Sequence, residues 1–266
     1  MGAAAVAGRL TLGRRPRPAA GREAPEGLAF HTPGGPLVAV CGLVGGAGAS
    51  TLAYLLARRA ARHSSAPVLL TELQERGALA ALAGAAAPLA LRELADAVEQ
   101  QREPERAFAD LAGGLRLVAS DRAGPTEPVA AAALARLLAD ARDAHGLVVI
   151  DAGPPGGPDH DTLIDAATHS LFVLPATAAA VRHVALLAPG GVFDGSAATR
   201  SALVAVATYP GPRAAVKRLR RLAEPHLERL LLVPHVPELA AGKHHQAEPR
   251  LEATFAALAT LLRRRR

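Results

Sequence analysis

A glycine-rich segment, Val44 to Thr51, holds the residues best suited to chemistry in this chain of 266 residues. It reads Val-Gly-Gly-Ala-Gly-Ala-Ser-Thr and follows Leu37–Cys41, a short apolar run rich in β-branched residues. Ser50-Thr51 opens a helical pattern that runs to His63. Glycines let a backbone approach an anion closely, and the free N–H groups at a helix N-terminus point towards it. The segment therefore predicts a phosphate cradle.

The elements around this loop alternate between strands and helices. Strands are expected over 37–41, 68–72, 115–119, 147–151, 170–174, 202–208 and 230–234. Helices are expected over 51–63, 128–144, 161–167, 178–188, 213–226 and 250–262, with a broken one over 79–101. This alternation indicates βαβ units. Several strands are apolar throughout, as in sheets covered on both faces. We therefore predict an α/β fold with a doubly wound, mainly parallel sheet flanked by helices.

The ends of the chain differ from its body. Residues 1–36 are rich in Pro, Arg and Gly and show no periodicity, so we expect a disordered arm before a domain over 37–266. The formal net charge is +6. The arm carries five arginines against two glutamates and the last four residues are all arginine, so the rest is close to neutral. This distribution argues against specific nucleic-acid binding by the domain.

The cellular compartment is predicted from the single cysteine and from the lack of a signal peptide or membrane-spanning run. Cys41 is the sole cysteine, which excludes an internal disulfide framework and favours a reducing cytoplasm. Neither a signal peptide nor an apolar run long enough to span a bilayer is found. We therefore expect a cytoplasmic protein.

Three segments resemble motifs of the ParA/MinD group of P-loop ATPases, and the order of elements is similar over about residues 37–240. The glycine loop resembles the deviant Walker A motif of that group, usually K-G-G-x-G-K-[ST]-T. Leu147–Pro155 resembles the Walker B strand, in which an aspartate, here Asp151, reaches magnesium through water. Val233–Ala240 is similar to a late segment beside the nucleotide base, which implies a contact from Pro234. The lysine-free loop is most similar to the CpaE/TadZ-like branch.

The resemblance implies ATP or ADP with Mg as cofactors. Ser50 and Asp151 would hold the magnesium ion. The phosphates would lie against Gly45, Gly46, Ala47, Gly48, Ala49, Ser50 and Thr51.

The sequence departs from the motif where catalysis needs it most. The two lysines of the motif fall on Val44 and Ala49, and the only lysines in the chain are Lys217 and Lys243. A P-loop lysine reaches the β- and γ-phosphates, so its loss removes a phosphate contact. The group's D-x-D falls on Glu72-Leu73-Gln74, and a glutamine can orient a water but cannot accept its proton. We expect little or no ATP hydrolysis, and nucleotide binding that is weak or lost.

The resemblance further implies a localisation or assembly factor, for a pilus or secretion apparatus or for septum placement. Its partners would be proteins of that apparatus, and the protein itself would form a homodimer. Leu251, Phe255, Leu258 and Leu262 fall on one face of a C-terminal helix that precedes the arginine tail. Packing of this helix on the sheet is the first expectation. Peripheral contact with the inner face of the membrane is the alternative.

Other interpretations of the same residues stay open. An active ATPase could rebuild the lysine function from an arginine such as Arg182 or from a partner. Gly46-Ala47-Gly48, with Glu72 at the end of the second strand, also fits dinucleotide binding, and a glycine turn can be purely structural. Asp159-His160-Asp161 and His244-His245 suggest metal ligands. The spacing of the first favours a solvated loop, and the second lies near Gly242 in a polar linker, where exposure is expected.

Overall fold

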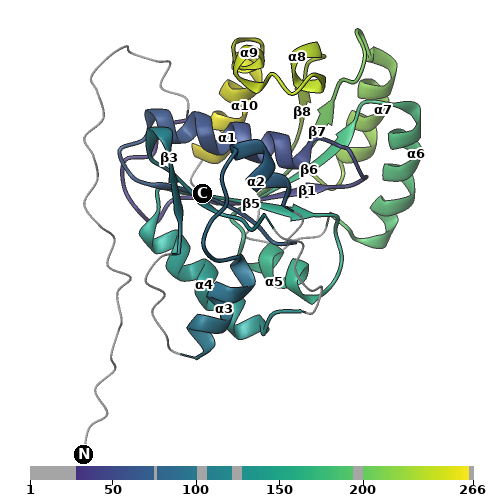
Figure 1. Cartoon of the computed structure of the whole chain (residues 1–266). Coiled ribbons are helices and arrows are strands. Elements are labelled where there is room, and N and C mark those ends of the chain that lie inside the picture. Colours follow the sequence, from purple (N-terminus) through teal and green to yellow (C-terminus); the bar gives the residue numbers. More distant parts are fainter. Residues whose placement is uncertain (1–27, 75–76, 101–106, 122–127, 194–199, 264–266) are drawn as a thin grey trace, which may run out of the picture.

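One eight-stranded sheet forms the centre of the protein (Figure 1). The computed structural model describes residues 28–74, 77–100, 107–121, 128–193 and 200–263. The strands are β1 (Leu37–Gly42), β2 (Val68–Glu72), β3 (Ala109–Leu111), β4 (Leu115–Val118), β5 (Leu147–Gly153), β6 (His169–Pro175), β7 (Arg200–Val206) and β8 (Arg229–Val233). Their order is β3-β4-β2-β5-β1-β6-β7-β8, and every pair is parallel except β3 with β4.

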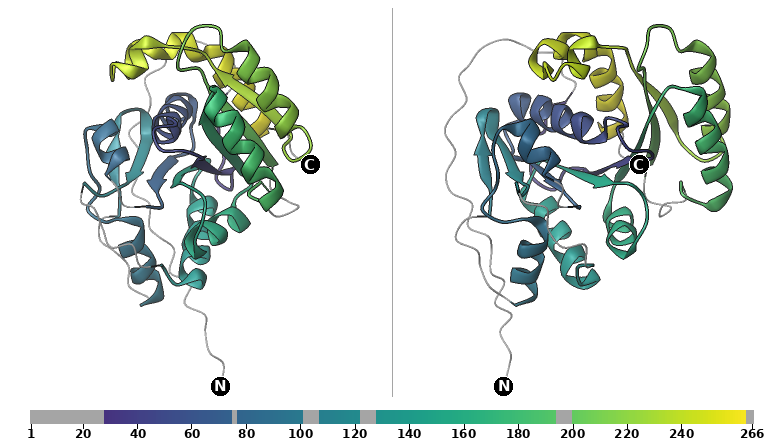
Figure 2. Two further views of the ribbon diagram at one scale, coloured as in Figure 1. Left: turned by 90° about the vertical axis from the view of Figure 1, so that its right-hand side faces the viewer. Right: turned by 45° about the vertical axis from the view of Figure 1, so that its right-hand side comes forward.

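Helices cover both faces of the sheet (Figures 1 and 2). On one face lie α1 (Ala49–His63), α2 (Ala78–Ala83), α9 (His244–Ala247) and α10 (Glu252–Arg263). On the other lie α3 (Leu91–Glu99), α4 (Ala131–Ala144), α5 (Pro158–Ala166), α6 (Ala178–Leu187) and α7 (Arg213–Ala223). A short helix, α8 (Pro237–Ala240), follows β8. The predicted doubly wound, mainly parallel α/β fold is confirmed.

β1 lies in the middle of the sheet because its residues are buried from both sides. All six of its residues, Leu-Val-Ala-Val-Cys-Gly, are buried. β5 pairs with one edge of the strand and β6 with the other. Alternate side chains of β1 therefore enter the two cores, Val38 and Val40 on the α1 side and Leu37 and Ala39 on the α4 side. The loop that follows β1 is thus fixed at the carboxyl edge of the sheet.

Residues 28–36, which were predicted to belong to the arm, contact the domain. Leu28 is buried, and the backbone of Phe30 is held at both its polar groups. The Phe30 N–H donates to Ser64 Oγ at 2.9 Å, and the Phe30 carbonyl accepts from the N–H of Ala66 at 3.0 Å. Residues 28–36 therefore belong to the domain, whereas the rest of the predicted arm, 1–27, lies outside the described residues.

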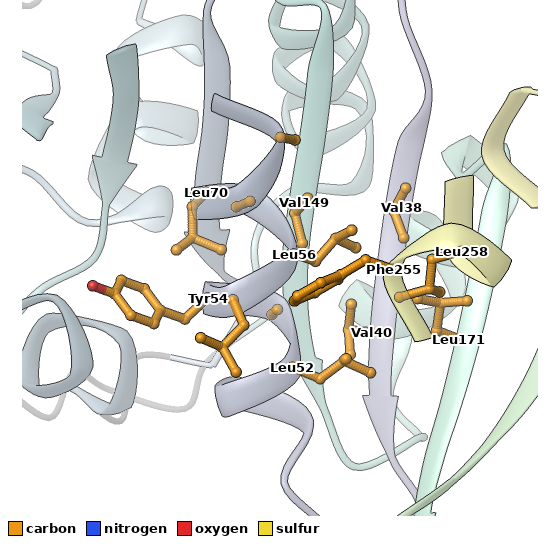
Figure 3. Close-up of a cluster of buried hydrophobic side chains, with 14 of the residues drawn as sticks. Val38, Val40, Leu52, Tyr54, Leu56, Leu70, Val149, Leu171, Phe255 and Leu258 are labelled. Atoms are coloured by element: carbon orange, nitrogen blue, oxygen red, sulfur yellow. The ribbon is translucent and has the colours of Figure 1, made fainter. Parts of the chain in front are cut away.

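The C-terminal helix packs on the sheet, as first expected. Figure 3 shows Phe255 and Leu258 of α10 directed towards the side chains of α1 and the central strands. Leu251 and Leu262 lie in the same buried cluster. The apolar face on which the alternative of a membrane contact depended is thus covered by the protein. Within the described residues, no helix is long and apolar enough to cross a bilayer.

Candidate phosphate-binding site

The loop between β1 and α1 has the backbone form of an anion cradle. Gly46 and Gly48 adopt φ angles of 71° and 88°, which residues with a side chain rarely adopt. The Leu43 N–H donates to the Val173 carbonyl at 2.9 Å, which ties the base of the loop to β6. A Cβ atom added at Gly45, Gly46 or Gly48 would meet no heavy atom within 4 Å. The glycines therefore border open space, where a ligand can approach the backbone.

The start of α1 is suited to receive negative charge. Gly48 is the N-cap residue, no side chain caps the helix, and its first turn contains no acidic residue. The first N–H groups of a helix have no partner within the helix and carry the positive end of its dipole. Ser50 and Thr51 in this turn are half-buried. The amides and hydroxyls of the predicted cradle are thus kept.

The two positions that carry lysine in the resembling motif are apolar and packed. Ala49 is buried, and its Cβ would lie 3.3 Å from a Cβ placed on Gly42. Val44 is partly buried and packs against the core beneath α1. The two lysines of the chain, Lys217 and Lys243, are exposed on late elements. The cradle therefore has no lysine of its own loop to contact a phosphate.

A histidine that no sequence pattern singles out contacts the loop. His183 of α6 places Nε2 3.0 Å from the carbonyl oxygen of Leu43. The two residues are 140 positions apart, so no local pattern could have joined them. Its neighbour Arg182, the candidate substitute cation, is exposed. The contact brings α6 to the edge of the cradle.

Asp151 lies near the end of β5, beside the strand that leads into the loop. It is opposite Val40 of β1 on one side and Glu72 of β2 on the other. The carboxylate is 6% exposed, and its Oδ1 accepts from the Gly153 N–H at 3.3 Å. Because the strands are parallel, their carboxyl ends meet at the edge that carries the cradle.

The donor set fits magnesium that is shared with a ligand. Mg²⁺ prefers oxygen donors and commonly takes one or two protein ligands, with phosphates and waters completing its shell. Ser50 and Asp151 supply a hydroxyl and a carboxylate at this edge. Among the described residues, no group of three His, Cys, Asp or Glu side chains could hold a metal alone. A magnesium ion held at this edge would therefore need a phosphate ligand to complete its shell.

The two residues at the positions of the group's acids have different surroundings. Glu72 is buried, and its Oε1 accepts from the N–H of Gly77 at 3.2 Å, across the turn after β2. Gln74 packs over Gly153, where an added Cβ would lie 2.8 Å from both Cδ and Oε1 of the glutamine. Its Oε1 is buried and has no hydrogen bond to a described residue. Gln74 therefore lies next to the loop of Asp151 but offers no base.

Beneath the cradle, Cys41 and His160 are in contact. Cys41 Sγ lies 3.6 Å from His160 Nε2, and both side chains are buried. Burial, with a smaller contribution from the charge of Asp151, raises the pKa of the Cys41 thiol to about 12. Burial also lowers the pKa of His160. The thiol is therefore protonated at neutral pH and is not an activated nucleophile.

The remaining candidate ligands do not converge. Asp159 accepts from the Val129 N–H at 2.9 Å, His160 faces Cys41, and Asp161 is exposed. His244 lies edge-on to the ring of Tyr54, with 6.3 Å between the ring centroids. Pro234 is half-buried after β8, at the same edge of the sheet as the cradle but three strands from β1.

Comparison with known proteins shows the fold. No protein-family model matches the sequence, and no curated protein matches it. The structure is similar to a ParA family ATPase from Chlorobium tepidum TLS, with 13% identity, a TM-score of 0.67, and coverage of 85% of this chain and 98% of that one.

Two further solved structures are similar over comparable lengths. A complex of a Cyanothece McdA variant with ATP has 19% identity and a TM-score of 0.65, and the match covers 88% of this chain and 98% of that one. The MinC:MinD cell division protein complex of Aquifex aeolicus contains a chain with 15% identity, a TM-score of 0.61, and coverage of 85% of this chain and 93% of that one. The protein thus has the fold of ParA/MinD-type P-loop ATPases.

Proposed function

We propose that this protein is a degenerate ParA/MinD-type nucleotide-binding protein that acts as a localisation or assembly factor and hydrolyses little or no ATP. The observation that carries the proposal is the combination of an intact backbone cradle with apolar, packed side chains at Val44 and Ala49. The backbone conformation that would bind phosphate is kept, whereas the lysines that would stabilise the transfer of a phosphoryl group are missing.

The missing lysines should reduce the rate of ATP hydrolysis more than they reduce the affinity for nucleotide. A hydrogen bond to a charged group contributes about 1.5–3 kcal/mol, so each missing lysine weakens nucleotide binding by about 10- to 100-fold. A cation supplied to the transferring phosphoryl group contributes about 10³-fold or more to its rate. With two lysines absent and Gln74 unable to accept a proton, turnover falls much further than binding.

In this proposal the remaining residues hold ATP or ADP. The backbone amides of Gly45, Gly46 and Gly48 and of the first turn of α1 wrap the phosphates. Ser50 and Asp151 hold magnesium, which supplies the charge that offsets the phosphates. A similar protein, the McdA variant, forms a complex with ATP in its solved structure, which supports nucleotide as the ligand of this fold.

The protein would work by binding partners rather than by chemistry. The resemblance of its lysine-free loop to the CpaE/TadZ-like branch favours the apparatus of a pilus or secretion system, or of septum placement. A similar structure contains the cell division proteins MinC and MinD as a complex, which supports a protein partner. A homodimer formed over the nucleotide would let the bound ligand control that partner.

One observation favours a second candidate, an active ATPase with a substitute cation. Arg182 is exposed and directly precedes His183 in α6, and His183 contacts the loop at Leu43. The contact of His183 brings the helix that carries Arg182 to the loop, and an arginine guanidinium can bind phosphate in place of lysine.

Calorimetric titration of the full chain with ATP and ADP, with and without magnesium, tests the proposal together with radiolabelled ATP turnover. We expect magnesium-dependent binding that Asp151→Ala weakens, and turnover near the uncatalysed rate. Asp165→Ala, at an exposed site on α5, is the control. Turnover that Asp151→Ala abolishes would overthrow the proposal, and loss through Arg182→Ala would establish the second candidate. No binding of either nucleotide would reduce the protein to a scaffold.

A further inference from the structure

The outer face of α7 is strongly basic, although the domain as a whole is close to neutral. Its exposed cations are Arg213, Lys217, Arg218, Arg220 and Arg221. The side of the helix that faces the sheet is apolar and buried, through Ala215, Leu219 and Ala223. Between Tyr209 and Leu227 the single acid of the sequence is Glu224. The cations are therefore concentrated on one surface with little compensating charge.

The spacing of three of these cations lowers the stability of the helix, although Arg220 and Arg221 lie in its last turn, where the helix dipole favours positive charge. Arg213, Lys217 and Arg221 follow one another at intervals of four residues, where like charges repel and each pair costs about 0.2–0.5 kcal/mol. Arg213 is the first residue of α7, at the positive end of the helix dipole. Within the part of the chain that the structure describes, none of the three forms an ion pair. The pattern points to a negatively charged partner outside the chain.

An exposed leucine lies on the neighbouring helix. Leu186, in the last turn of α6, is 78% exposed, more than the other large apolar side chains of the described residues. The left view of Figure 2 shows α6 and α7, in two shades of green, side by side on the surface that faces the viewer. Each helix connects two neighbouring parallel strands, α6 between β6 and β7 and α7 between β7 and β8, so the two helices run in the same direction. Leu186 is therefore at the same end of the layer as Arg220 and Arg221.

We propose that this basic face, the outer sides of α6 and α7 with Leu186, docks onto an anionic lipid bilayer. Lipid headgroups pair with the cations, and the leucine enters the interface between headgroups and acyl chains. A protein partner fits less well, since it would have to bring a matching acidic surface, and acidic residues are depleted at protein interfaces. Nucleic acid would use the cations but leave the leucine without a contact. Of these three partners, only a bilayer would contact both the cations and the leucine.

This inference rests on the proposed positioning function and deepens it. It assigns the membrane contact to the outer sides of α6 and α7, because the apolar face of α10 is buried against the sheet. Its test needs no nucleotide, so the two proposals can fail separately. The full chain is mixed with phosphatidylcholine vesicles, with or without phosphatidylglycerol, and the bound fraction is measured by co-sedimentation. We expect binding to the anionic vesicles alone, weakening as salt is raised.

A matched pair of variants locates the contact. Lys217→Gln/Arg221→Gln removes two exposed cations from the basic face, and Arg136→Gln/Lys243→Gln removes the same two residue types elsewhere. Each cation near an anionic leaflet strengthens binding by about 5-fold. The first variant should therefore bind about 30-fold more weakly at low salt, and the second should bind like the wild type. The basic arm and the arginine tail are the same in both.

Leu186→Ser tests the apolar contact. It should weaken vesicle binding by about 10-fold and leave the dependence on salt unchanged. Circular dichroism confirms that the variants stay folded. Equal binding by the two double variants would overturn the proposal. The proposal would also be overturned if the protein bound duplex DNA but not vesicles, and if Lys217→Gln/Arg221→Gln weakened that DNA binding.

Discussion

Glu248, near the end of the chain, lies 2.5 Å from the Nη1 atom of Arg62 in the helix that begins at the cradle. The same carboxylate is 3.7 Å from Arg58, and the side chains of Glu248 and Arg58 are 9% and 8% exposed. The C-terminal segment is thereby fixed to α1 by a largely buried ion pair. Phe255 adds a second contact, since the Arg59 guanidinium lies 5.9 Å from the centre of its ring.

Removing the carboxylate should destabilise the fold. Glu248→Ala leaves Arg58 buried beside another cation, and breaking a buried pair in this way costs about 3 kcal/mol in the free energy of unfolding. Glu252→Ala is the matched control, because that side chain is 45% exposed in its pair with Arg59. It should cost less than about 1 kcal/mol. Urea unfolding measures both, and equal losses would contradict a special role for Glu248.

Stability should fall as the pH is lowered below about 6.5. Burial is the main reason that the pKa of His145 and that of His169 are lowered to about 4. Between the unfolded value of about 6.5 and this value, the unfolded chain binds protons that the native protein does not. From about pH 7 to about pH 5, each histidine should therefore remove about 2 kcal/mol of stability.

Urea midpoints across this pH range test the expectation. His169→Gln should remove about 2 kcal/mol of the decrease. His226→Gln, at an exposed site, is the control and should keep it. Stability that stays level down to about pH 5 would show that neither ring resists protonation in the native state.

Cys41 should not react in the native protein. Its thiol is buried, and burial raises its pKa to about 12, so thiolate is scarce at neutral pH. A disulfide reagent such as dithionitrobenzoate should label the thiol in urea at the rate of an ordinary cysteine. Under native conditions the labelling should be as slow as unfolding. Rapid labelling of the native protein would mean that the base of the cradle opens to solvent.

Restoring a cation to the loop should strengthen nucleotide binding. In Ala49→Lys the new amine enters the cradle at the position of the missing lysine and should raise ATP affinity by about 10-fold or more. Ala131→Lys is the matched control, because Ala131 is also the first residue of a helix, α4, but lies away from the loop. Titration calorimetry compares the two. Equal affinities would show that the loop does not receive phosphate.

Local patterns predicted most of the elements but not which of them lie next to one another in the sheet, and the short β3, α8 and α9 were missed. All seven predicted strands are present, with ends within two residues of those expected. β3 was not predicted because its three residues, Ala-Asp-Leu, carry no alternation long enough to detect. The order of the strands depends on pairings between distant segments, so no window of sequence contains it.

The candidate site was predicted in part for the same reason. Gly46 and Gly48 were identified because a phosphate-binding turn of this kind needs glycine, and Asp151 because its strand resembles the Walker B motif. The contact of His183 with Leu43 is formed only by the folded sheet. The basic face of α7 cannot be inferred from the net charge of the domain, because a sum does not show where the charges lie.

The central place of β1 has a consequence for synthesis. Leu37 pairs with Val148 and Val38 with His169, so both partners of the first strand are made long after it. A growing chain therefore leaves the ribosome with an apolar strand that has no edge to join. Loop closure over such distances slows folding and prolongs exposure to aggregation. Chaperones that shield nascent chains should therefore raise the yield of this protein more than that of one whose strands pair as they emerge.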